Sequence, residues 1–130
     1  MADFSRKLGD VEMDGLITDL TPKTEVRGKT IRKVDKETVY KRGTVFGMSN
    51  KDNKLVILGT SGDGETITAD CILCDDITVG TSDDVVATVY TAGCFNADKI
   101  TVADSYELSA EDYDTLRKYG IVFKTASAAN

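Results

Sequence analysis

Three cysteines are the residues of this chain whose type and spacing come closest to a chemical site. Cys71 and Cys74 form a CxxC pair, which in a turn can bind zinc or carry out redox chemistry. The pair falls in a segment that we expect to be a strand, where an offset of three sends two side chains to opposite faces. Cys94 raises the ligand count only to three, so zinc would need a carboxylate as well. We therefore expect three free, buried thiols and no metal, cofactor or disulfide.

Paired carboxylates are the second candidate for chemistry. Asp75 and Asp76, and Asp83 and Asp84, are adjacent pairs, and Asp63 lies in the segment SGDGE. Such acids can build a calcium site or the carboxylate pair of a glycosidase. None of them matches the fixed spacing of an EF-hand loop, and acids beside turns are usually solvated. We expect solvated loop residues here.

The chain contains no histidine. Histidine is the usual general base, the usual partner of a nucleophilic serine or cysteine, and the commonest transition-metal ligand. Its absence excludes Ser-His-Asp and Cys-His catalysis. Neither GxGxxG nor GxxxxGK[ST] occurs, so no nucleotide-binding loop is predicted. The residues therefore indicate a protein that is not an enzyme.

Length and charge narrow the class further. A chain of 130 residues is the usual size of one domain with its own core. The formal net charge of −6 would repel a nucleic-acid backbone, so no direct binding to DNA or RNA is expected. No apolar run is long enough to cross a bilayer, and no secretory signal is recognisable. We expect a soluble protein that is made in a cytoplasm and contacts no membrane.

The charge is unevenly distributed along the chain. Residues 23–42 hold eight basic and three acidic groups, a local charge of +5, whereas the rest of the chain is acidic. This basic segment is either a solvated surface or a patch that meets an acidic partner. The candidates for such an electrostatic contact are Arg27, Lys29, Arg32 and Lys33.

The elements that must position these residues are mostly strands. β-branched and aromatic residues, bounded by turn-forming Gly, Asn and Asp, predict strands over residues 38–49, 54–59, 66–77, 85–95 and 121–124. Residues 78–84 are expected to form a turn.

One helix is indicated, with Ser109 as its N-cap, Asp112 completing a capping box and Gly120 ending it. Tyr113 and Leu116 share one face of this helix. The fold class is therefore mostly β with one short C-terminal helix.

The first residues differ from the rest, because Gly9 and Gly15 interrupt any helix there. The segment GLITDL predicts a short strand with Leu16 and Leu20 on one side and Ile17 on the other. We divide the chain into an extended N-terminal arm with a leading strand, residues 1–38, and a single β-rich domain, residues 39–130.

Four stretches resemble, in order and spacing, the lambda-type bacteriophage head decoration proteins. They are KRGTVFG (41–47), ADCILCDDI (69–77), ATVYTAGCFNADKIT (87–101) and LRKYGIVFK (116–124). The positions of this chain that match the family pattern are Gly43, Gly47, Gly93, Phe95, Asn96 and Gly120. The three cysteines stand where we expect other small or polar residues in the family pattern. The resemblance spans about residues 40–124 and gives no alignment for residues 1–38.

The resemblance implies a β-clip-like fold and a homotrimer on the outer capsid surface of a virion. Its partner would be the major capsid protein of an HK97-fold head, bound at local threefold positions after expansion. The implied function is structural stabilisation of the head against the pressure of packaged DNA, without a cofactor. The alternative that the residues leave open is a small ligand- or glycan-binding β domain of a phage tail or adhesin.

The resemblance also implies that the N-terminal arm docks beside strands of the capsid protein, by β-augmentation. The expected anchors are Leu16, Ile17 and Leu20, with Phe4 and Leu8 as outer anchors. The alternative is that GLITDL pairs with the sheet of its own chain.

Overall fold

The computed structural model describes residues 15–60 and 64–124, and in this part the chain is mostly β with one α-helix. The strands are β1 (Ile17–Asp19), β2 (Glu25–Ile31), β3 (Thr38–Tyr40), β4 (Val45–Ser49), β5 (Leu55–Ile57), β6 (Ile67–Leu73), β7 (Ile77–Val79), β8 (Val85–Asn96) and β9 (Ile121–Lys124). The helices are the 3-10 turn η1 (Ala97–Lys99) and the α-helix α2 (Ala110–Tyr119). No helix of the described part is long and apolar enough to span a membrane.

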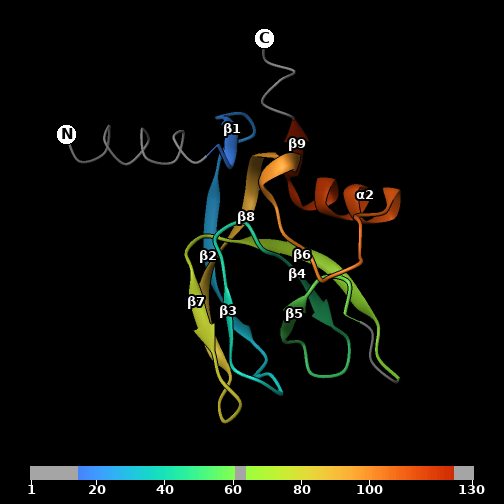
Figure 1. Cartoon of the computed structure of the whole chain (residues 1–130). Coiled ribbons are helices and arrows are strands. Elements are labelled where there is room, and N and C mark those ends of the chain that lie inside the picture. Colours follow the sequence, from blue (N-terminus) through green and yellow to red (C-terminus); the bar gives the residue numbers. More distant parts are fainter. Residues whose placement is uncertain (1–14, 61–63, 125–130) are drawn as a thin grey trace, which may run out of the picture.

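Five strands close into a ring in the order β8, β2, β5, β4, β6 and back to β8. All neighbours in this strand ring are antiparallel except β2 and β5, which are parallel where Ile31 meets Leu55. Strands β3 and β7 form a separate two-stranded ribbon beside it (Figure 1). The predicted mostly β class with one C-terminal helix is confirmed, and β2 in the ring lies within residues 1–38.

Strand β8 joins the ring to a second, smaller set of strands. Its residues 85–92 pair with β2, and its residues 93–96 pair with β9 on one side and β1 on the other. Figure 1 shows β1 and β9 at the same end of the molecule, with α2 on one side of the ring. We call β1, β9 and residues 93–96 of β8 the terminal sheet, because the described chain begins and ends beside it.

Two hydrophobic cores lie on opposite sides of the ring wall. The inner core takes side chains from all five ring strands and from the β3–β7 ribbon, namely Ile31, Tyr40, Phe46, Leu55, Cys71, Leu73, Val79, Ala87 and Val89. The outer core lies between the ring, α2 and the terminal sheet, and contains Leu16, Val45, Leu58, Ala69, Ile72, Cys74, Tyr90, Phe95, Leu116 and Ile121. The alternation of side chains along a strand supplies both cores from the same β strands.

Helix α2 begins and ends where the sequence predicts. The Ser109 hydroxyl accepts a hydrogen bond from the Asp112 amide, and the Asp112 carboxylate accepts one from the Ser109 amide. Gly120 adopts φ +101° and donates its amide to the carbonyls of Leu116 and Arg117. Leu116 is the buried residue of the helix and packs into the outer core.

Two predicted strands are wrong as single elements. The strand expected over residues 38–49 is divided into β3 and β4, and the one expected over 66–77 ends at Leu73 before β7 begins. Residues 78 and 79, expected in a turn, belong to β7. The two breaks are joined by Asp76, whose carboxylate accepts the Arg42 amide at 2.7 Å. A contact between segments that are distant in the sequence therefore lies where β3 and β7 separate from the strand ring and pair with each other.

Candidate binding surface

The terminal sheet is the part of the fold to which residues 1–14 are joined. The Leu16 carbonyl accepts the Asn96 amide at 2.7 Å, and Ile17 lies opposite Phe95. Across the sheet, Lys124 Nζ on β9 lies 3.0 Å from Asp19 Oδ2 on β1. Segments whose residues are 105 positions apart in the sequence thus form one surface.

The five expected arm anchors have different surroundings. Leu16 is 2% exposed and belongs to the outer core, Ile17 is half-buried, and Leu20 is 61% exposed. The strand is shorter than the predicted segment GLITDL, so Leu16 precedes β1 and Leu20 follows it. The segment 17–19 pairs with β8 of its own chain. Phe4 and Leu8 lie outside the described residues.

Some side chains of the basic segment, residues 23–42, form ion pairs with acidic residues of the same chain. Arg32 contacts Asp52 and Glu65 at 2.8 Å each, and Lys29 contacts Asp70 at 2.7 Å. Hydrogen bonds from the Arg32 guanidinium lower the pKa of the Asp52 and Glu65 carboxyls. These pairs join β2 to the turn before β5 and to β6.

Two of the four candidate basic residues remain for an outside partner. Arg27 and Lys33 are exposed, and within residues 15–60 and 64–124 neither side chain takes part in an ion pair. The Lys33 backbone amide, by contrast, donates to Asp84 at 2.9 Å. An electrostatic contact would therefore centre on Arg27 and Lys33.

The positions that match the family pattern have structural roles. A Cβ on Gly47 would lie 2.4 Å from Ile67 Cγ2, so a larger residue there would force β6 to shift at this bulge. Gly93 adopts φ +146° at the point where β8 leaves the ring, a conformation that other residues rarely adopt. Phe95 is fully buried in the outer core, and the Asn96 side chain caps η1 by accepting the Asp98 amide.

The remaining glycines of this set lie at chain reversals. Gly43 has φ +97°, and a Cβ there would lie 2.7 Å from the Lys99 carbonyl oxygen. Gly120 ends α2 and leads directly into β9. These residues shape the surface beside the terminal sheet and expose no side chain of their own.

The three cysteines are free thiols that are buried in the fold. Cys71 lies in the inner core and Cys74 in the outer core, which confirms that they point to opposite sides, although Cys74 follows β6 rather than lying in it. Cys94 is buried, and its thiol lies 3.3 Å from the Thr18 hydroxyl. Burial raises the pKa of the Cys71 and Cys74 thiols, so both stay protonated at neutral pH. Within the described residues no three His, Cys, Asp or Glu side chains gather as metal ligands.

One carboxylate of each acidic pair accepts hydrogen bonds from another segment of the chain. Asp76 accepts the Arg42 amide, and Asp84 accepts both the Lys33 amide and the Lys54 ammonium. Asp75 and Asp83 are not buried, which fits the expected solvated loops. Asp63 lies outside the described residues.

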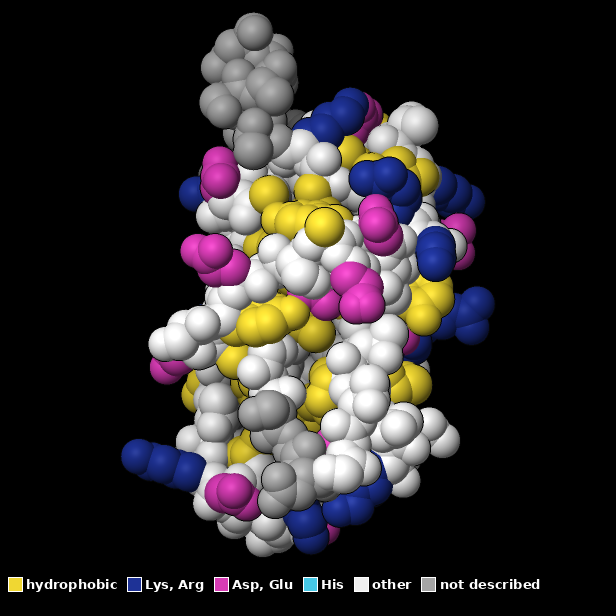
Figure 2. Space-filling model, turned by 90° about the vertical axis from the view of Figure 1, so that its right-hand side faces the viewer, with side chains coloured by type: hydrophobic (Ala, Val, Ile, Leu, Met, Phe, Trp, Pro, Cys, Tyr) yellow, Lys and Arg dark blue, Asp and Glu magenta, His cyan; other side chains and the backbone are white. Residues whose placement is uncertain are grey.

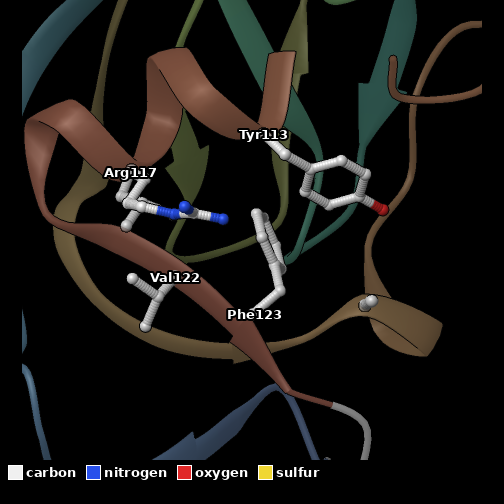
Figure 3. A pocket seen from close by; sticks show the side chains of 6 residues that line it. Tyr113, Arg117, Val122 and Phe123 are labelled. Carbon is white, nitrogen blue, oxygen red and sulfur yellow. The ribbon is translucent and has the colours of Figure 1, made fainter. Parts of the chain in front are cut away.

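A pocket opens between α2 and β9, close to the terminal sheet. It has a volume of about 300 Å³ and is lined by Ala97, Tyr113, Arg117, Ile121, Val122 and Phe123. Figure 3 shows Arg117 reaching from α2 toward the Phe123 side chain, with Val122 on the strand beside it and Tyr113 on the other side. Figure 2 shows hydrophobic side chains exposed toward the upper end of one face of the molecule, with Lys and Arg side chains nearby. The sequence pattern placed Tyr113 on the same helix face as Leu116 but gave no signal for a pocket, because its walls meet only in three dimensions.

The described chain is thus a small β-rich body with a terminal sheet and a pocket beside it. Among known families, the model of the bacteriophage lambda head decoration protein D matches residues 15–121. The chain therefore belongs to this family of structural, non-enzymatic proteins, which decorate and stabilise the phage capsid and sit on its surface in the virion. No curated protein matches the chain.

Proposed function

We propose that this protein is a homotrimeric clamp with a β-clip-like fold. It binds the major capsid protein at the local threefold positions of an expanded HK97-fold head and holds the shell against the pressure of packaged DNA. The family match over residues 15–121 is the observation that carries this proposal. The gripping arm in this proposal is residues 1–14, because β1 and β2, which also lie within residues 1–38, pair with strands of the body.

Several equivalent weak contacts can together hold this protein on a shell. One copy offers a small contact surface, since β1 and β9 are only three and four residues long. Three copies related by a threefold axis present the same weak contact three times, and linked contacts raise the overall affinity without a new interaction. A trimer therefore suits a lattice whose own subunits meet at threefold positions.

The N-terminal arm supplies the specific contact in this proposal. It joins the described chain at Gly15, two residues before β1, and we assign it a strand that pairs with the capsid protein. Phe4 and Leu8 are its apolar anchors, and the exposed Leu20 lies at the other end of β1. Leu16 and Ile17 contribute by holding β1 against β8, because they pack into or beside the outer core.

Electrostatic attraction assists docking through Arg27 and Lys33, which are exposed. Such a contact between exposed charges weakens as salt screens it.

Deletion of residues 1–14 tests the assignment of the arm. The truncated protein retains Leu16 and β1, so its far-ultraviolet circular dichroism, melting temperature and oligomeric state should match those of the full chain. Binding to purified, undecorated expanded heads should be lost, as measured by co-sedimentation and by density at threefold positions in electron micrographs. Deletion of residues 1–20 is a poorer test, because it also removes a core residue. Normal decoration by the shorter deletion would contradict the arm assignment, and bare heads with the full chain would contradict the proposed function.

A further inference from the structure

The pocket between α2 and β9 lies close to Gly15, the residue at which the N-terminal arm begins. A Cβ placed on Gly15 would be 3.4 Å from Lys99 Cε and 3.9 Å from Asn96 Nδ2. Ala97, which lies between these two residues in sequence, lines the pocket. Gly15, where the described chain begins, therefore lies close to η1, which forms one side of the pocket.

The walls of the pocket combine aromatic and aliphatic side chains with one arginine. Tyr113 and Phe123 meet edge to face, with their ring centroids 5.3 Å apart, and both are half-buried. Ile121 is fully buried, while Val122 and Ala97 are half-buried at the sides. A concave surface of this kind suits one apolar side chain, because burying it releases water from both surfaces.

One wall of the pocket carries the positive charge of Arg117. Within residues 15–60 and 64–124, no ion pair or hydrogen bond engages the Arg117 guanidinium. Lys118, the next residue, is exposed and is likewise without an ion pair in this part of the chain. Basic residues in the last turn of a helix also interact favourably with its dipole, and both residues share that benefit. Of the two, only Arg117 lines the pocket as well.

We propose that this pocket binds an apolar side chain that stands next to a carboxylate on an exposed segment of the capsid protein. The apolar side chain packs against Tyr113, Phe123 and Val122, and the carboxylate pairs with Arg117. Arg guanidinium groups pair with carboxylates in two parallel hydrogen bonds, which fixes the register of the bound segment. This inference rests on the proposed capsid-binding function and adds a second contact to the arm.

The position of the pocket favours the capsid segment as its occupant. The pocket opens at the end of the molecule where the arm begins, and the arm in the proposed function lies along the capsid. The Arg117 guanidinium, which has no ion pair within residues 15–60 and 64–124, is complementary in charge to a carboxylate on such a segment. Occupation by a second copy or by residues 1–14 is an outcome that the test separates.

The test compares Arg117→Gln with Lys118→Gln, its neighbour on the same helix turn that does not line the pocket. Both variants should keep the melting temperature and oligomeric state of the unaltered protein. The dissociation constant for undecorated expanded heads should rise at least about fivefold for Arg117→Gln, since three copies dock together, and less than about twofold for Lys118→Gln. A photoreactive benzoylphenylalanine in place of Tyr113 should form an adduct with the capsid protein on decorated heads.

Several results would overturn the proposal. If the two substitutions weaken binding to the heads equally, Arg117 contributes only general electrostatic attraction. Adducts formed only with the decoration protein itself would assign the pocket to a second copy or to residues 1–14. If the unaltered protein decorates heads while Arg117→Gln binds equally well and no capsid adduct forms, the pocket inference fails and the proposed function stands. If the unaltered protein leaves heads bare, the proposed function fails and this inference fails with it.

Discussion

Replacing Leu116 by alanine should loosen helix α2 from the rest of the molecule. Leu116 is completely buried in the outer core, and it is the buried residue of a ten-residue helix. Its neighbours in that core include Ile72 on β6 and Ile121 on β9, whose backbones are held by strand pairing. They can therefore move little to fill the space that the substitution leaves.

The expected cost follows from this burial. Buried Leu→Ala substitutions lower the free energy of unfolding by about 2–5 kcal/mol, with the larger values where the cavity cannot collapse. We expect a loss of about 3 kcal/mol here, in the middle of that range. With a urea m-value of about 1.5 kcal/mol per molar, the unfolding midpoint should fall by about 2 M.

Urea unfolding followed by circular dichroism measures this change, at one fixed protein concentration because association of copies also affects apparent stability. Tyr119→Ala is the matched control. Tyr119 lies in the same helix but is 52% exposed, so its removal should cost less than about 1 kcal/mol. Similar midpoints for the two variants would refute the view that the outer core holds α2 in place.

Two further predictions concern ionisable groups. Burial raises the pKa of the Cys74 thiol to about 12, and the other two thiols are buried as well. An aromatic disulfide reagent at pH 8 should therefore label the three cysteines slowly until urea unfolds the protein. Rapid labelling of the native protein would contradict this expectation. Because Arg32 lowers the pKa of the Asp52 and Glu65 carboxyls, their contribution to stability is present above the ordinary carboxyl pKa of about 4 and is lost as the pH falls through the lowered values. Urea midpoints between pH 6 and pH 2 should therefore fall less steeply for Arg32→Gln, and identical pH profiles would refute the role of this network.

Features that depend on neighbouring residues can be predicted from the sequence. The limits of α2 follow from Ser109, Asp112 and Gly120, because a cap forms within one turn of the chain. The short strand at residues 55–57 and the last strand at 121–124 follow from apolar and β-branched runs beside turn residues. The lack of histidine excludes the commonest catalytic arrangements on composition alone. The family pattern is visible because its glycines stand at bulges and reversals where a side chain would clash or strain the backbone.

Which residues lie on the surface, and which are used inside, depends on tertiary contacts. Leu16 is buried while Leu20 is exposed, because Leu16 packs into a core that residues of β8, α2 and β9 complete from distant parts of the sequence. Arg32 is engaged by Asp52 and Glu65, so its charge is satisfied within the fold. Local sequence cannot report such contacts, since they depend on segments that meet only after the ring closes. The pocket between α2 and β9 has the same origin, because its walls come from η1, α2 and β9 and exist only when the terminal sheet has formed.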